Sequence, residues 1–357
     1  YAVRAQDTFG AGEDRPITLK IAGRVEAGQE VTDMLQRGLA IEIATGAPIS
    51  RGANAVVMVE YTQQHDDNVD VYRAVTPGEN VVGAGTDVMM GEVILRKGQR
   101  ITPREMGVIA ALGLKAVRVY KKPMVAVMST GNELRSAGTP LKYGEVYDIN
   151  SSSIAGAVLE SGCCPVLVGI APDEPVALRE KVEIALSTAD VLVTSGSTSA
   201  GAGDLLYRIV DMLGEPGVLV HGLAVKPGKP AFMAIVKGKP VFGLPGYPTS
   251  ALMIFIQVVR PLLLEMAGCK EMFGEKIVEA KTATKIFSQR GRRELLTVHV
   301  VRDESGQFLC YPLTSGSGAI TTLAQADGYV DIPESQEIVA EGELIKVRLF
   351  GEAPKLS

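Results

Sequence analysis

The most constraining feature of the sequence is the alternation, from Met124 to about residue 260, of short apolar runs with segments of helical periodicity. The predicted order is strand 125–128, helix 152–160, strand 166–170, helix 174–186, strand 191–193, helix 205–213, strand 241–244 and a helix after Pro248. Such alternation is typical of a doubly wound parallel sheet. Ligands of these sheets bind where the strands end and the loops begin.

The flanking regions read as β-rich. Short apolar runs separated by Gly, Pro, Asn and Asp predict strands at 17–25, 39–43, 55–59, 69–75, 278–284, 294–301, 308–313, 329–332 and 344–349. Between the first β-rich region and the alternating segment, Thr102 can cap a helix that starts at Pro103, with Glu105 completing a capping box. This helix is expected to stop at Gly113.

These patterns predict a multidomain α/β and β protein. Its central part is a doubly wound α/β domain over 123–268, between an inserted N-terminal β domain over 11–95 and a C-terminal β-barrel-like domain over 269–357. Residues 1–10 and 96–122 are assigned to a split linker subdomain that contains the capped helix.

Charge and cysteine content exclude several classes of function. Lys plus Arg number 36 and Asp plus Glu 41, a net charge of −5, which argues against an extended nucleic-acid surface. The four cysteines form no C-x-x-C pair and the three histidines lie far apart, so a structural zinc site is not expected. The neighbours Cys163 and Cys164 are interpreted as buried thiols in a reducing compartment, which favours the cytoplasm.

A membrane partner is not expected either. Residues 240–259 carry no charge, but Pro245, Gly246 and Pro248 interrupt this stretch and Arg260-Pro261 ends it.

Three polar loops follow strands of the α/β segment. They run from Ser129 to Glu133, from Tyr147 to Ser151, and from Ser195 to Asp204. Hydroxyls and backbone N–H groups at helix N-termini hold phosphate well, although each loop alone could be a helix cap with a tight turn. Asp148 and Asp204 are the carboxylates best placed for Mg²⁺, and Asp204 could instead cap the helix that begins at Leu205.

Two loops stiffened by proline add positive charge and hydroxyl groups. In Lys226-Pro227-Gly228-Lys229-Pro230, the two ammonium groups can converge on one anion, or the lysines can face water on an ordinary turn. The run 243–250, which ends in Tyr247-Pro248-Thr249-Ser250, could bind a ligand or serve only as a strand-to-helix turn.

The chain resembles a known family in six motifs that occur in order. They are Thr45-Gly46-Ala47-Pro48, Ser129-Thr130-Gly131-Asn132-Glu133-Leu134, Val146-Tyr147-Asp148-Ile149-Asn150, the Ser195 to Asp204 loop, the Lys226 to Pro230 loop and the Gly243 to Ser250 loop. On these residues the sequence resembles the molybdopterin molybdenumtransferases, which are related to the C-terminal domain of gephyrin. Tyr1-Ala2-Val3 is similar to the end of the family's D-G-Y-A-V segment, so the family's N-terminal helix is expected to be absent here.

The resemblance implies a homodimer of four subdomains, with a site between the α/β domain of one protomer and the C-terminal β domain of the other. It implies that molybdate and adenylylated molybdopterin are the substrates, that Mg²⁺ is the cofactor and that AMP is released. The molybdopterin adenylyltransferase, whose fold the α/β domain shares, is a possible partner.

The resemblance also implies roles for individual residues. Asp148 and Asp204 would hold Mg²⁺ or orient the attacking oxygen, and Lys226 and Lys229 would act with them on the reacting anion. The residues expected to bind substrate are Thr45, Gly131, Glu133, Asn150, Ser195, Gly196, Ser197, Gly246, Ser250, Arg292 and Ser317. Molybdate is a dianion, for which fixed positive charge and hydroxyl donors are suitable partners.

Two residues depart from the family pattern, and two other functions compete with the main one. Ser197 stands where the family usually has a second Gly, and Tyr247 where many members have Asn. The alternatives are the preceding step, adenylylation of molybdopterin with consumption of ATP, and a gephyrin-like scaffold without turnover.

Overall fold

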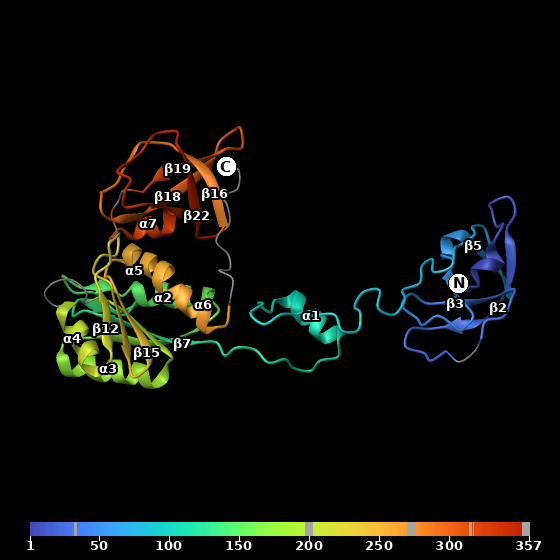
Figure 1. The fold of residues 1–357 in the computed structure, drawn as a ribbon, viewed down its shortest axis with the longest axis horizontal. Coiled ribbons are helices and arrows are strands. Elements are labelled where there is room, and N and C mark those ends of the chain that lie inside the picture. Colours follow the sequence, from blue (N-terminus) through green and yellow to red (C-terminus); the bar gives the residue numbers. More distant parts are fainter. Residues whose placement is uncertain (32–33, 197–202, 270–275, 314–315, 317, 352–357) are drawn as a thin grey trace. The chain divides into compact units, whose positions relative to one another are not determined.

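The computed structural model describes residues 1–31, 34–196, 203–269, 276–313, 316 and 318–351. The chain divides into two compact units, Tyr1–Ile94 and Leu95–Ser357 (Figure 1).

The first unit is built on a six-stranded sheet with the order β4-β1-β3-β2-β6-β5. The strands are β1 (Ala2–Val3), β2 (Ile17–Val25), β3 (Leu39–Ile43), β4 (Ala55–Val56), β5 (Thr62–His65) and β6 (Asn68–Val71). Two short 3-10 turns, η1 (Ala5–Thr8) and η2 (Val59–Tyr61), accompany them. The predicted strands 17–25 and 39–43 are confirmed, and those at 55–59 and 69–75 are shorter than predicted.

The core of this unit explains why β1 belongs to its sheet. Ala2 and Val3 are fully buried, and β1 pairs antiparallel with both β3 and β4. The structure therefore places Ala2–Val3 within the first unit, whereas the predicted boundaries between the subdomains stay predictions.

The helix α1 (Pro103–Ala111) begins as the sequence predicts. The backbone N–H of Thr102 donates to the carboxylate of Glu105 at 2.8 Å, and the Thr102 hydroxyl also contacts this carboxylate. These bonds lower the pKa of Glu105 below its usual value. Gly113, at φ +72°, takes the left-handed conformation that ends the helix.

The central domain contains a six-stranded sheet with the order β10-β7-β11-β15-β14-β12. The strands are β7 (Met124–Thr130), β10 (Cys164–Ala171), β11 (Val191–Ser195), β12 (Gly217–His221), β14 (Phe232–Val236) and β15 (Lys239–Leu244). The first four in the sheet order are parallel, as expected. The doubly wound α/β fold is confirmed. The sheet also contains β14 and β12, for which the sequence predicted no strand, and β14 runs antiparallel to both of its neighbours, β15 and β12. Lys237 and Gly238, both at positive φ, form the tight turn that joins β14 to β15.

Helices cover both faces of this sheet (Figure 1). The helices α3 (Pro175–Thr188) and α4 (Gly203–Leu213) pack on one face, and α2 (Asn150–Glu160), α5 (Pro248–Ile254) and α6 (Arg260–Met266) on the other. A π-helical turn, η3 (Phe255–Val259), joins α5 to α6 into one continuous helix. All the predicted helices are therefore present.

The continuous helix Pro248–Met266 is the one segment among the described residues that is long and apolar enough to cross a membrane. Half of its apolar window is buried inside the domain. Its side chains at Ala251, Phe255, Val259 and Leu263 are fully buried in the core beneath the sheet, as in a core helix of a globular domain.

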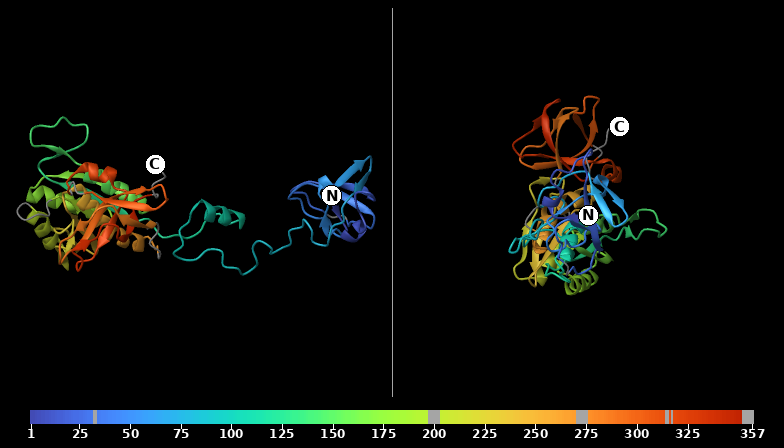
Figure 2. Two further views of the ribbon diagram at one scale, coloured as in Figure 1. Left: turned by 90° about the horizontal axis from the view of Figure 1, so that it is seen from above. Right: turned by 90° about the vertical axis from the view of Figure 1, so that its right-hand side faces the viewer.

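The short pair β8 (Leu134–Arg135) and β9 (Val146–Tyr147) forms an excursion between β7 and α2. It projects from the central domain in both views of Figure 2. Arg135 pairs with Glu145 at 2.6 Å inside it, whereas Tyr143 at its tip is fully exposed. The excursion therefore has its own internal order while presenting apolar side chains outward.

The C-terminal domain is a closed five-stranded barrel. The strands follow the order β18-β19-β16-β22-β20, and β20 pairs back with β18 to close the ring. They are β16 (Lys276–Thr282), β18 (Arg293–Arg302), β19 (Phe308–Pro312), β20 (Gly328–Ile332) and β22 (Leu344–Leu349), with α7 (Ile320–Gln325) and the pair β17 (Ile286–Phe287) and β21 (Ile338–Val339) beside them. The predicted barrel-like domain and its five strands are confirmed.

The interpretation of both neighbouring cysteines as buried is half wrong. Cys163 is 3% exposed, and burial raises the pKa of its thiol to about 11. Cys164 is exposed because it begins β10, the edge strand, and adjacent residues of a strand point to opposite faces.

Candidate functional site

The first part of the site lies where β7 ends and α2 begins. Asp148 Oδ1 accepts from Ser129 Oγ at 2.8 Å and from the backbone N–H of Ser151 at 3.0 Å. The hydroxyls of Ser129 and Ser151 also lie 2.9 Å apart. Asp148 is thereby held at the N-terminus of α2, where the helix dipole favours negative charge.

A second set of bonds ties three strand-end loops together. Asn150 Nδ2 donates to Ser195 Oγ at 2.5 Å and to the carbonyl of Gly246 at 2.8 Å. Ser195 Oγ donates in turn to the carbonyl of Pro245 at 3.2 Å. Since Asn150 and Ser195 are 7% and 2% exposed, these bonds are made away from bulk water.

Two glycines allow the loops to approach this closely. Gly196 lies at φ +100°, and a Cβ there would stand 2.2 Å from the carbonyl oxygen of Thr130. Gly131 lies at φ +154°, and a Cβ there would stand 2.7 Å from the carboxylate of Glu133. The structure thus brings Glu133 to the end of β7, beside the loop that carries Asp148.

The loop before α5 contributes buried hydroxyls. Ser250 and Thr249 are each 3% exposed, and Pro248 occupies the first turn of the helix. Thr249 Oγ1 has no hydrogen-bond partner among the described residues. Gly318 of the barrel lies so close to Tyr247 that a Cβ would stand 3.3 Å from the tyrosine ring. A loop of the barrel therefore reaches this loop within one chain.

The lysine loop makes a different contact from the one expected. Lys226 Nζ lies 2.8 Å from Glu294 Oε1, and both residues belong to paired strands, β13 (Val225–Lys226) and β18. Lys229 is exposed, and its carbonyl accepts from the backbone of Leu223. The convergence of the two ammonium groups on one anion stays a prediction.

The remaining predicted residues are placed as follows. Ser197 and Ser317 lie outside the described residues, and Asp204 lies in the first turn of α4, with its side chain outside the described part. Arg292 is half-buried just before β18.

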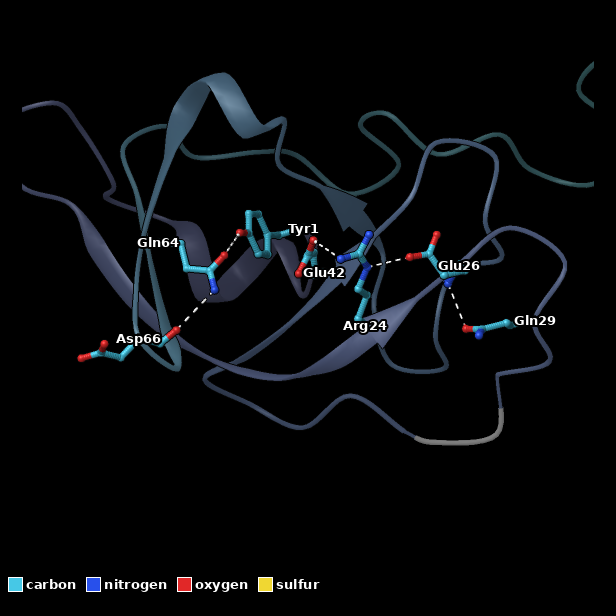
Figure 3. Close-up of polar contacts among 7 residues, drawn as sticks. All are labelled: Tyr1, Arg24, Glu26, Gln29, Glu42, Gln64 and Asp66. Atoms are coloured by element: carbon cyan, nitrogen blue, oxygen red, sulfur yellow. Dashed lines mark hydrogen bonds and ion pairs between the residues drawn. The ribbon is translucent and has the colours of Figure 1, made fainter.

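Thr45 belongs to the first unit. It is exposed, in a turn that follows β3 and includes Gly46 at positive φ. Figure 3 shows the nearby polar contacts on this sheet, in which Arg24 lies 2.6 Å from Glu26 and 3.5 Å from Glu42. Thr45 lies in a different compact unit from the loops of the central sheet, and its predicted role in substrate binding stays a prediction.

The oxygen-rich end of α2 fits a hard cation better than a soft one. Asp148 supplies a carboxylate, and the buried amide oxygen of Asn150 has no hydrogen-bond donor within the described part of the chain. No group of three or more His, Cys, Asp or Glu side chains suited to a metal occurs among the described residues. This donor set suits Mg²⁺, which takes one or two carboxylates and completes its shell with phosphate oxygens and water.

A cavity of about 250 Å³ lies between the central domain and the barrel. Its wall includes Thr249 and Phe255 from the long helix and Tyr329 and Phe350 from the barrel. Gln257 donates to the hydroxyl of Tyr329 at 2.6 Å beside it.

Sequence reasoning did not assign a role to Ser129, Ser151, Thr249 or Glu294. Ser129 and Ser151 stood inside the polar loops, whose hydroxyls were a visible signal. Glu294 followed three arginines near the start of a strand and looked like an ordinary surface charge. Only the pairing of β13 with β18 shows that Glu294 lies opposite Lys226.

These features define a class of protein: a multidomain protein with a central α/β domain and a C-terminal β-barrel, in which polar loops gather at the strand ends of the central sheet. Comparison with known families identifies it further. Residues 1–113 match the MoeA N-terminal region (domain I and II), 126–265 a probable molybdopterin binding domain, and 279–350 the MoeA C-terminal region (domain IV).

Individual relatives agree with these matches. The chain is 36% identical to molybdopterin molybdenumtransferase 2 of Mycobacterium tuberculosis over 97% of this chain and 86% of that one. It is 30% identical to the molybdopterin molybdenumtransferase of Bacillus subtilis over 99% and 82%. The crystal structure of the molybdopterin biosynthesis MoeA protein of Pyrococcus horikoshii matches with a TM-score of 0.82 and 40% identity, covering 99% of this chain and 86% of that one. The chain belongs to the molybdopterin molybdenumtransferase (MoeA) family.

Proposed function

We propose that this protein transfers molybdenum from molybdate into adenylylated molybdopterin, with cleavage of the phosphoanhydride and release of AMP. The observation that carries the proposal is the joining of three strand-end loops by Asn150, next to Asp148 at the start of α2. This arrangement concentrates hydroxyls, an unpartnered amide oxygen and a helix N-terminus at one edge of the sheet, which suits a phosphate-bearing ligand.

Magnesium would be held by Asp148 and Asp204. Bound there, it would neutralise the charge on the phosphoanhydride oxygens. In this proposal the chain's own groups hold the rest of the substrate: the loop of Ser195, Gly196 and Ser197 contacts the pterin or phosphate.

The molybdate oxygens would meet fixed positive charge and hydroxyls. Lys226, Lys229 and Arg292 would supply the charge, and Ser250 and Ser317 the hydroxyl donors. The lysine loop is well suited to this, since Pro227 and Pro230 limit its freedom and Gly228 lies packed against Ile254. Thr45, Gly131 and Glu133 would complete the substrate contacts.

We further propose that the protein acts as a homodimer in the cytoplasm, with the molybdopterin adenylyltransferase as a possible partner. Exposed apolar side chains in α1 and between α1 and β7 support an interface with a second copy: Met106 is 62% exposed, Leu114 49% and Val119 68%. Exposed apolar groups this closely spaced are typical of protein–protein contacts.

The direct test measures AMP release from adenylylated molybdopterin with and without molybdate and Mg²⁺. We expect release that depends on both, and a loss of about 100-fold or more in Asp148→Asn. The amide of this variant can still accept from Ser151, so the helix start should persist.

Asp303→Asn is the matched control, since Asp303 accepts from a serine hydroxyl and a backbone N–H in the same way, but in the barrel. Equal AMP release from wild type and Asp148→Asn would contradict the assigned role. Consumption of ATP with molybdopterin, and no response to molybdate, would instead favour the adenylyltransferase alternative.

A further inference from the structure

We infer that Glu294 is a positioning residue that fixes the ammonium group of Lys226 for molybdate. The inference rests on the proposed function. Lys226 ends β13, which lies between β12 and β14 in the chain but pairs with β18 of the barrel, and Glu294 is the second residue of β18. Their contact therefore joins the lysine loop to the barrel.

The carboxylate of Glu294 is itself held from the side away from the lysine. Its side chain is 7% exposed, Oε1 lies 2.8 Å from Lys226 Nζ, and Oε2 accepts from Ser288 Oγ at 2.7 Å. A carboxylate buried to this degree needs such partners, because an unpaired buried charge is strongly unfavourable. The position of Glu294 Oε1 is therefore set by the barrel before any ligand binds.

The backbone reinforces this arrangement. In the parallel pairing of β13 with β18, Lys226 stands opposite Glu294, and the N–H of Arg293 donates to the carbonyl of Ala224 at 3.0 Å. Two residues further on, a Cβ at Gly228 would stand 2.3 Å from Ile254. The lysine loop is thus fixed on one side by the barrel and on the other by α5.

The side chain of Lys226 is still half-exposed, so a ligand can reach it. That side chain is 49% exposed, against 7% for Glu294. An ammonium has three donors, so a bond to Glu294 leaves two for an oxyanion. A lysine ordered by a fixed partner loses less side-chain entropy when the ligand binds.

The sign of the expected effect separates positioning from simple charge. A carboxylate close to an oxyanion site repels the anion, so removing its charge should tighten molybdate binding if charge alone mattered. If Glu294 acts by holding Lys226, the same change should weaken binding.

The test compares wild type with Glu294→Gln in two measurements, molybdate binding by equilibrium dialysis and the molybdate KM for AMP release. We expect both constants to rise about 10-fold or more, as for loss of a charge-assisted hydrogen bond. Ser288→Ala, which keeps both charges and only loosens the carboxylate, should raise them by about 3-fold and covers the case in which Glu294→Gln does not fold. Unchanged or tighter binding in a folded Glu294→Gln, or in Ser288→Ala, would overturn the inference.

A double-mutant cycle distinguishes positioning from general destabilisation. In a Lys226→Gln background, Glu294→Gln should change the molybdate constants by less than about 2-fold, because its only route of action is gone. An undiminished effect there would overturn the inference. Asp331→Asn is the matched control, because it breaks the ion pair between Asp331 of β20 and Arg293, the neighbour of Glu294 in β18. It should leave molybdate binding within about 2-fold of wild type.

The inference and the proposed function can fail separately. If the wild-type protein binds molybdate but releases no AMP, the proposed function fails and dialysis still decides the role of Glu294. If wild type releases AMP and Glu294→Gln matches it in both constants, the function stands and the inference fails.

Discussion

Asn150 Nδ2 and Ser195 Oγ are joined by a 2.5 Å hydrogen bond that links the first residue of α2 to the last residue of β11. The two residues are 45 positions apart in the chain, and the bond is buried. Through the further bond from Asn150 to Gly246, one amide group orders three loops.

Replacing this amide should therefore affect stability and activity together. Asn150→Ala leaves both Ser195 Oγ and the carbonyl of Gly246 without the amide N–H donor, which should cost about 1–3 kcal/mol in the free energy of unfolding. AMP release should fall at least about 10-fold, because the loops lose their common bridge. Urea denaturation and the AMP assay measure the two effects.

Ser152→Ala is the control for Asn150→Ala, since Ser152 is exposed on the same helix. It should change the free energy of unfolding by no more than about 0.5 kcal/mol and leave AMP release near the wild-type rate. A stable and fully active Asn150→Ala protein would show that the bridge is dispensable.

The second prediction concerns the packing of the lysine loop. Gly228 lies at φ +117°, and the added methyl group of Gly228→Ala would overlap Ile254. We expect a loss of about 1–3 kcal/mol beyond the cost of positive φ alone, together with weaker molybdate binding. Gly238→Ala serves as the control, because Gly238 also has positive φ, at +77°, but open space around it. Similar losses of stability in the two variants would mean that Ile254 yields to the methyl group.

The third prediction concerns alkaline pH. Burial raises the pKa of the Cys163 thiol from 9.0 to about 11, so the folded state keeps this thiol neutral where the unfolded chain already ionises it. The contribution of the neutral Cys163 thiol to the free energy of unfolding is complete below pH 9 and is lost as the pH rises from about 9 to 11. Urea midpoints at several pH values for wild type and Cys163→Ala should differ in their pH dependence in this window.

The neighbouring exposed thiol gives the control. Cys164→Ala should follow the wild-type pH dependence, and Cys164 should react with iodoacetamide before Cys163 does in the native protein. Equal labelling of both thiols in the native state would be inconsistent with the burial of Cys163.

The fourth prediction concerns the excursion that carries β8 and β9. The backbone N–H of Lys142 and then Arg135 hold the pKa of Glu145 below its usual value. Because the folded pKa is depressed, the stabilisation is present above about pH 4.5 and is lost as the pH falls through the folded value. Hydrogen exchange over residues 134–147 should therefore show lower protection at pH 3.5 than at pH 6, after correction for the intrinsic rates.

Glu145→Gln should show reduced protection of this segment already at pH 6, because an amide replaces the carboxylate. Glu180→Gln, on the exposed side of α3, should leave the segment unchanged. Protection that stays constant with pH in the wild-type protein would mean that the Glu145 contacts do not order the excursion.

Local patterns in the sequence were sufficient for most of the elements. Apolar runs bounded by turn residues gave β2, β3 and β22 with the observed limits, and the Thr102, Pro103 and Glu105 pattern gave the start of α1. These features depend on neighbours within a few residues, so the chain alone specifies them. The family was recognisable for a related reason, because its loop motifs are contiguous.

Strand direction and strand neighbours were beyond local patterns. β14 has the same apolar character as the parallel strands, and only the tight turn at Lys237 and Gly238 sends β15 back beside it. The closing of the barrel likewise depends on β18 meeting β20, which lie about 30 residues apart in the chain.

The sequence by itself therefore determined most of the elements, the family and the loops in which the site residues stand. The tertiary structure decided which of these residues meet: Asn150 with Ser195, Asp148 with Ser129, and Lys226 with Glu294. It also decided that Cys163 is buried and Cys164 exposed. The physical reason is that a hydrogen bond or ion pair depends on the distance between two groups in space, and that distance is set by sheet order and helix packing over the whole domain.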